Sequence, residues 1–273
     1  MHRYAVLLAA FTLFLIITGA AVTSSHEEAP APIMTTGVFS QQAHAVEGSV
    51  AGLLALGFAI GLSFVDKRTW VCRLAWTVLA AFALQGALGV QTLLKSFPGS
   101  AGVALAGLAQ LIFAGTVLLA VFTSRSFQAG PEPVVDHGWP SLRSLAVITP
   151  SLVLIQVLLG AAFRHKALGV MWHILGAMVV ALMTLILGMF VLQQFPKHHS
   201  LRPAAIVLMT FTFTQVLIGT AVISMQMMAN ANTPPVVVVT VIHVATGALT
   251  LAASLVIAVQ IRRNVHAPQP GVP

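Results

Sequence analysis

Long apolar stretches alternate with short polar segments along the whole chain. Eight of these stretches have the roughly 20 apolar residues that are needed to cross about 30 Å of hydrocarbon. Because backbone groups in lipid must form their hydrogen bonds within the chain, each stretch is expected to be a helix. We predict spans at roughly 4–23, 41–65, 71–94, 101–123, 144–163, 170–192, 203–224 and 236–260. The pattern predicts an all-α integral membrane protein.

The longest polar segment separates two sets of four spans. It contains Pro131, Pro133 and Pro140, which interrupt regular structure. The first span also resembles a signal peptide, because Arg3 precedes an apolar run and small residues. Its length and its share of an internal repeat favour a membrane span instead. The predicted organisation is an N-terminal half (1–123), a linker (124–143), a C-terminal half (144–263) and a disordered tail (264–273).

Composition and charge support a membrane location and indicate its orientation. Of the 273 residues, 58% are hydrophobic and 7% are charged, which is too few charges for a soluble surface. Of the 13 lysines and arginines, all but Lys95, Arg164 and Lys166 lie on one side of the predicted spans. The positive-inside rule therefore predicts cytoplasmic termini in the cell (inner) membrane, and it explains the net charge of +7 without a nucleic-acid partner. The single cysteine, Cys72, excludes an internal disulfide.

A helix pair is repeated along the chain. The odd-numbered spans share a glutamine followed four residues later by a glycine, which suits close helix packing. The even-numbered spans share a histidine followed by a glycine, except that the fourth span has valine in the histidine slot. We therefore predict two parallel four-helix bundles built from this repeated pair. The odd-span copies are Gln85 with Gly89, Gln156 with Gly160, Gln215 with Gly219 and the decayed Leu15 with Gly19; the even-span copies are His44 with Gly48, Val103 with Gly107, His173 with Gly176 and His243 with Gly247.

Three of the ten histidines, His44, His173 and His243, fall inside predicted spans, at equivalent repeat positions near the outer face. Ionisable residues within a bilayer are costly and are usually functional, although a purely structural role is the alternative. Imidazole binds heme iron, zinc or copper. Since the spans offer few further ligands, a planar heme held between two facing helices is the favoured interpretation.

The residues suggest different roles for the two halves. His173 and His243 are predicted to be a bis-histidine pair for heme iron. His44 is predicted to bind heme iron in the N-terminal half, where its partner slot is Val103. The iron there would be five-coordinate, and the alternative is that this site binds nothing. Glu47, the only acid in a span, shares a helix face with His44 and is a candidate catalytic group, with structural pairing as the alternative.

Further outer residues could complete these sites. Arg164 and Lys166 are predicted to bind heme propionates, with contacts to lipid headgroups as the alternative. His165 and His26 are candidates for a missing ligand from the outer side, although ordinary loop histidines are the simpler interpretation.

The chain resembles the heme A synthase family of cytochrome oxidase assembly proteins. The most specific segment is Gly160-Ala161-Ala162-Phe163-Arg164-His165 followed by His173, and Ile242-His243 at the eighth helix also matches. The resemblance implies oxidation of the C8 methyl group of heme O to a formyl group. It implies heme b on His173 and His243, substrate heme O facing His44, and contact with the farnesyltransferase that makes heme O.

The chain departs from this family at three points. A second N-terminal histidine is replaced at Val103, the usual glutamate before the first histidine is Gln41, and a loop cysteine pair is absent. These departures keep open a non-catalytic heme-binding or electron-transfer protein derived from the family. A transporter is less favoured because the spans lack a charged pathway. A homo-oligomer is compatible with either interpretation.

Overall fold

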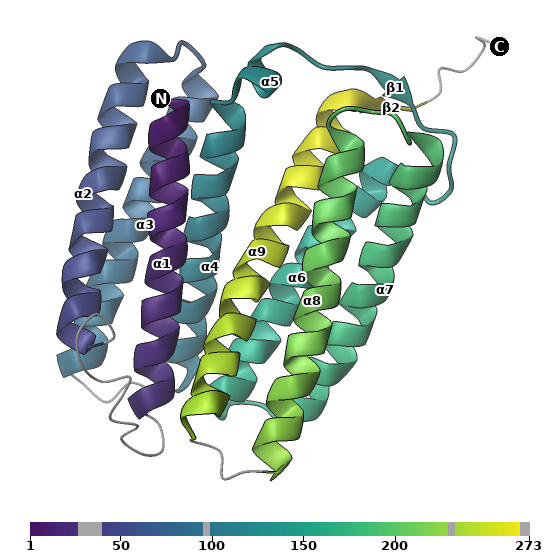
Figure 1. The fold of residues 1–273 in the computed structure, drawn as a ribbon. Helices are drawn as coiled ribbons and strands as arrows, with labels where there is room; N and C mark the ends of the chain where they lie inside the picture. Colours follow the sequence, from purple (N-terminus) through teal and green to yellow (C-terminus); the bar gives the residue numbers. More distant parts are fainter. Residues whose placement is uncertain (27–39, 95–98, 229–232, 268–273) are drawn as a thin grey trace.

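Eight long helices make up most of the protein (Figure 1). The computed structural model describes residues 1–26, 40–94, 99–228 and 233–267. Each long helix is apolar and long enough to cross a membrane, so the chain is a multi-pass membrane protein. The predicted spans are confirmed, with ends that differ by a few residues. The helices are α1 His2–His26, α2 Gln41–Val65, α3 Thr69–Leu94, α4 Gly99–Phe122, α6 Leu142–Arg164, α7 Val170–Gln194, α8 Leu201–Met228 and α9 Pro234–Asn264.

Short polar residues start several helices where the apolar runs begin. The Ser40 hydroxyl accepts a hydrogen bond from the Ala43 backbone N–H at the start of α2, and Ser141 does the same for Ser144 at the start of α6. Pro234 occupies the first turn of α9, where its missing N–H costs no helical hydrogen bond. The Ser40 cap places His44 in the first turn of α2, and His173 lies in the first turn of α7, which begins after Gly169 without a side-chain cap.

The helices form two groups that lie side by side (Figure 1). Helices α1 to α4 pack around one apolar cluster, whose largest buried side chain is Phe58. Helices α6 to α9 pack around another, which includes Leu187, Leu208 and Ile257. Many outward-facing side chains are large and apolar, as expected where the solvent is lipid rather than water.

A third apolar cluster joins the two groups. It contains Ile16 of α1, Phe113 of α4 and Leu251 of α9, all of them buried. Helix α4 also approaches α6 closely, because a Cβ added at Gly107 would lie 2.7 Å from Cδ2 of Leu158. Helices α1, α4, α6 and α9 therefore form the junction between the groups.

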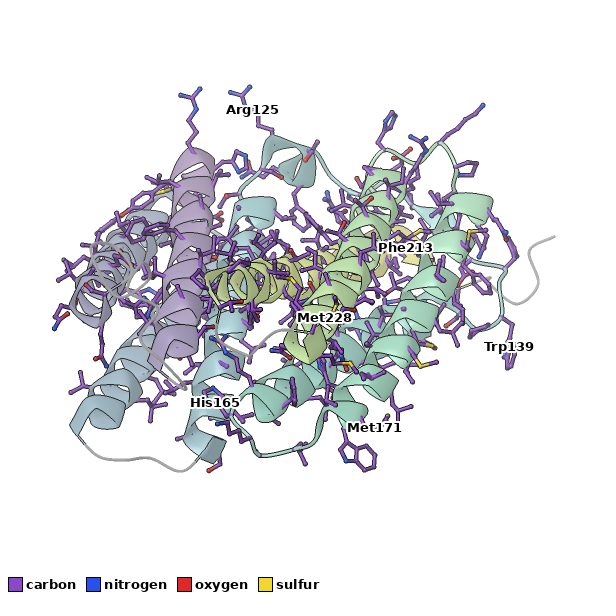
Figure 2. The ribbon with its side chains drawn as sticks, turned by 60° about the horizontal axis from the view of Figure 1, so that its bottom comes forward. Arg125, Trp139, His165, Met171, Phe213 and Met228 are labelled. Carbon is purple, nitrogen blue, oxygen red and sulfur yellow. The ribbon has the colours of Figure 1, made fainter. Side chains whose placement is uncertain are left out.

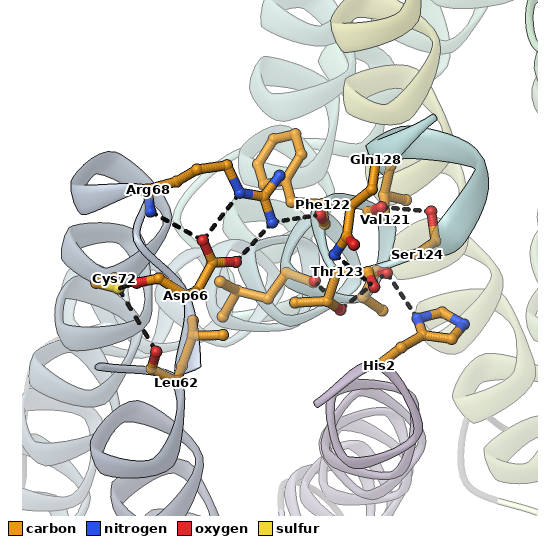
Figure 3. A network of polar contacts seen from close by, with 12 residues as sticks. His2, Leu62, Asp66, Arg68, Cys72, Val121, Phe122, Thr123, Ser124 and Gln128 are labelled. Atoms are coloured by element: carbon orange, nitrogen blue, oxygen red, sulfur yellow. Dashed lines mark hydrogen bonds and ion pairs between the residues drawn. The ribbon is translucent and has the colours of Figure 1, made fainter. Parts of the chain in front are cut away.

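Polar contacts hold together the end of the molecule opposite the three histidines (Figure 3). The Arg68 side chain donates to both carboxylate oxygens of Asp66, at 3.0 and 2.6 Å, and to the Phe122 carbonyl at 2.9 Å. The His2 ring contacts the Ala120 carbonyl at 3.0 Å. These bonds connect the α2–α3 turn and the start of α1 to the end of α4.

The predicted linker carries short elements and pairs with the C-terminal segment. It contains helix α5 (Arg125–Gln128) and strand β1 (Val134–Val135), and β1 lies parallel to β2 (Val265–His266). The prediction of a disordered tail at 264–273 is corrected at its start. Helix α9 extends to Asn264, and strand pairing satisfies the backbone groups of the next two residues. Residues 268–273 lie outside the described part of the chain.

Candidate functional site

The structure brings the rings of His173 of α7 and His243 of α9 close together within the C-terminal helix group. Their ring centres lie 6.1 Å apart, and the ring planes are nearly perpendicular at 83°. Two imidazoles that bind one metal ion from opposite sides, with metal–nitrogen bonds of about 2.0 Å, have ring centres about 6 Å apart. The predicted pair therefore has a separation that suits a shared metal ion.

Glycines of the preceding helices make room for these rings. A Cβ added at Gly160 would lie 2.8 Å from Cε1 of His173, and one added at Gly219 would lie 2.8 Å from Cε1 of His243. Both distances are shorter than ordinary carbon–carbon contacts, so an alanine would displace the rings. The odd-helix glycines, which the sequence suggested were for helix packing, support histidine rings.

The motif glutamines orient the same histidines. The Gln156 amide nitrogen contacts Nδ1 of His173 at 2.9 Å and donates to the His173 carbonyl at 2.8 Å. The Gln215 amide nitrogen lies 3.2 Å from Nε2 of His243. Glycines on the even helices admit these amides, since a Cβ at Gly176 would collide with Oε1 of Gln156. Each histidine thus has a glycine beneath it and an amide beside it.

Unpartnered polar atoms indicate that this site suits a further group. Nδ1 of His243 and the amide oxygens of Gln156 and Gln215 are buried without a hydrogen-bond partner among the described residues. Such atoms are uncommon in native proteins and call for a specific explanation. The ring separation and the glycine cradles fit a heme held through its iron. Because an amide nitrogen only donates, Nε2 of His243 accepts from Gln215 and the hydrogen lies on the buried Nδ1, so iron binding at this ring requires the Gln215 contact to change.

The N-terminal helix group contains a matching arrangement at His44. A Cβ at Gly19 of α1 would lie 3.0 Å from Cε1 of this ring. The Thr18 hydroxyl lies 2.8 Å from Nδ1 of His44 and donates to Glu47 at 2.8 Å. Because that hydroxyl has a single hydrogen, it accepts from the Nδ1–H of His44. Nε2 of His44 then carries the free lone pair that a metal needs.

Glu47 lies close to His44, and the Thr18 hydroxyl connects the two side chains. The closest oxygen of Glu47 lies 3.9 Å from Nδ1 of His44, and the Glu47 side chain is only 13% exposed against 36% for His44. Thr18 stands between them and bonds to both. The sequence placed Glu47 and His44 on one helix face but did not indicate Thr18. Thr18 contacts the ring of His44 as Gln156 and Gln215 contact the rings of His173 and His243, although Leu15 has the glutamine position in the repeat.

Arg164 and Lys166 lie at the end of α6, and the structure places them differently. One Arg164 nitrogen donates to the Ala20 carbonyl and the Ser24 hydroxyl of α1, at 2.5 and 2.6 Å. Lys166 is exposed and has a positive φ of 56°, in a turn whose backbone bonds return to Phe163 and Ala162. This turn is a Schellman motif, in which the left-handed position is usually glycine. Binding of heme propionates by either residue stays a prediction.

Other predicted positions are distributed around these rings. Gln41 begins α2, three residues before His44, and Val103 lies in the second turn of α4. A Cβ at Gly89, the matching glycine of α3, would meet nothing within 4 Å, as expected where the paired histidine is missing.

Among the residues that the structure describes, no group of three or more His, Cys, Asp or Glu could hold a metal ion. Lys95 and the His26 side chain lie outside the described part.

No protein-family model matches the chain, and no curated protein matches it either. The class of protein therefore follows from the fold and these residues: a multi-pass membrane protein with histidines set over glycines near one end of its helices.

Proposed function

We propose that the protein is a membrane heme protein of the heme A synthase type, which oxidises the C8 methyl group of heme O to a formyl group. The observation that carries this proposal is the pair His173 and His243, 6.1 Å apart over Gly160 and Gly219. The pair would hold heme b, and a bound heme b would supply one-electron transfer. Arg164, the last residue of α6, and Lys166, in the turn that follows, would bind its propionates.

The internal repeat is part of this proposal. We propose that α1–α4 and α6–α9 are parallel four-helix bundles built from one repeated helix pair. Support comes from the equivalent contacts of His44 with Gly19, His173 with Gly160 and His243 with Gly219. With the basic residues on the cytoplasmic side, these three histidines lie near the outer face of the cell membrane.

The N-terminal half would hold the substrate. His44 would bind the iron of the substrate heme through Nε2, because Thr18 holds the hydrogen of the ring on Nδ1. Oxidation of a methyl group to a formyl group with water as the oxygen source releases four protons and four electrons, and the electrons must pass to an external acceptor. Glu47, bonded to Thr18, is the carboxylate placed to accept a proton. Glu47 thus substitutes for the family's acid, whose position is Gln41 here. The farnesyltransferase that makes heme O is the expected source of substrate.

A second candidate function is a heme-binding or electron-transfer protein without catalysis. Two observations favour it: Gln41 cannot exchange a proton at neutral pH, and the histidine slot of α4 is Val103. This alternative retains heme b on His173 and His243 and predicts an unchanged heme side chain.

The test is purification in detergent from cells that also make heme O, followed by extraction and identification of the pigments. The parent is expected to yield heme b and heme A. His173→Ala and His243→Ala are expected to lose heme b, while the exposed His137→Ala serves as a control. Glu47→Gln is expected to retain heme b and lose at least 10-fold in heme A. Heme b alone in the parent would favour the second candidate, and an absence of heme would refute both.

A further inference from the structure

A fourth histidine ring lies over a glycine, and it comes from an unexpected place. His165 follows the last residue of α6, yet its ring lies against Gly102 of α4, in the other helix group. A Cβ added at Gly102 would be 2.5 Å from Cε1 and from Nδ1 of His165, and 2.8 Å from Nε2. The contact is tighter than the matching contacts of His44, His173 and His243. Figure 2 shows His165 at the end of the molecule that is turned forward.

The backbone and a neighbouring side chain hold His165 in this position. Its N–H bonds to the Ala161 carbonyl at 2.9 Å, and the next residue, Lys166, adopts the left-handed conformation that ends α6. Arg164, the residue before it, is bonded to Ala20 and Ser24 of α1. His165 is therefore held between an anchored arginine and a tight turn, and its ring is half-buried.

The Gly102 contact places His165 next to the helix position where the N-terminal site lacks a histidine. Gly102 immediately precedes Val103, the slot where the repeat lacks its histidine. On the other side, Ala20, which accepts from Arg164, immediately follows Gly19, which lies beneath His44. Helices α1 and α4 pack against each other. The rings of His44 and His165 thus lie at the same end of one helix pair, the first against α1 and the second against α4.

We propose that His165 is the second axial ligand of the heme in the N-terminal half, in place of the side chain that Val103 lacks. The inference rests on the proposed function, because it assumes a heme on His44. Under this inference a residue of the C-terminal half completes the N-terminal site. The site therefore forms only when the two helix groups are packed together. It also gives the iron two imidazole ligands, which favour a low-spin state.

The test uses the full-length protein loaded with heme O, with heme per chain and iron spin state as readouts. The parent is expected to hold two low-spin hemes. His165→Ala is expected to keep the heme on His173 and His243, and to bind the second heme at least 10-fold more weakly and in a high-spin state. Adding Val103→His to His165→Ala is expected to restore the low-spin signal. Leu168→Ala, an exposed position in the same turn, is the matched control.

A second variant tests the same contact from the side of α4, without removing the histidine. Gly102→Val places carbon atoms where the His165 ring lies, and it is expected to give the same high-spin signal while the C-terminal heme stays bound. Two low-spin hemes in both His165→Ala and Gly102→Val would overturn the inference and leave the proposed function intact. A parent with a single heme, lost in His173→Ala, would overturn the inference as well. A parent without heme would refute the proposed function itself.

Discussion

At the scale of single residues, glycines decide where the histidine rings lie. A ring over Gly19, Gly160 or Gly219 occupies the volume that any other side chain would need. The same residue type at Gly89 has no ring over it and leaves open space. The glycines of one sequence motif therefore have different physical roles, according to the residue that faces them.

Gly160→Ala and Gly89→Ala are expected to have opposite effects on stability. In Gly160→Ala the new methyl group meets the His173 ring at 2.8 Å and breaks its bond to Gln156, which costs about 1–3 kcal/mol. In Gly89→Ala the better helix propensity should add roughly 0.5–1 kcal/mol. Thermal unfolding in detergent measures both free energies. Equal effects of the two substitutions would contradict the role of Gly160 as a ring cradle.

At the scale of secondary-structure elements, the polar groups at helix ends fix how helices meet. Asp66 ends α2, accepts from the Arg68 backbone N–H at 2.9 Å and pairs with the Arg68 side chain. Arg68 in turn donates to the end of α4. The hydrogen bonds from Arg68 hold the pKa of the Asp66 carboxyl below its ordinary value. Ionised Asp66 therefore stabilises the α2–α3 turn and its docking on α4.

Stability is expected to depend on pH through Asp66. The pKa of this carboxyl is lower in the folded state than in the unfolded chain, so its contribution is complete above the ordinary value of about 3.8. It is lost as the pH falls through the lower folded value. Asp66→Asn should therefore melt at a lower temperature than the parent at pH 7, and the difference should vanish at acid pH. The exposed Arg73→Ala is the control, and a pH-independent difference would contradict the assignment.

At the scale of the whole molecule, the two helix groups are joined by apolar clusters, by side chains of α6 and its turn packed on glycines of α4, and by the directed bonds of Arg164. The cluster around Phe113 and Leu251 supplies non-directional packing, which by itself does not set the relative height of the groups. Arg164 adds directed bonds from α6 to the carbonyl and hydroxyl groups of α1. That bonding fixes the depth at which the α6–α7 turn meets α1 and α4.

Arg164→Leu is expected to loosen the junction. Hydrogen bonds to a charged group contribute about 1.5–3 kcal/mol, so the free energy of unfolding in detergent should fall by about that amount, and the melting temperature should fall with it. Protease cleavage in the linker between the groups should also become faster. Arg125→Ala, an exposed arginine in that linker, should leave the melting temperature unchanged. An unaltered melting temperature in Arg164→Leu would show that packing holds the groups together without the bonds of Arg164.

Sequence alone determined the membrane class, the eight spans and the three histidines. A helix in lipid must be apolar over its whole length, and a polar residue within it has a free-energy cost that makes it stand out in the sequence. It could not pair Thr18 with His44, or place a Gly102 cradle under His165, since neither has a spacing signal along the chain. A loop residue carries no periodicity, and its ring can reach any neighbouring helix. Which helices are neighbours depends on packing between α4 and α6, and that packing exists only in the tertiary structure.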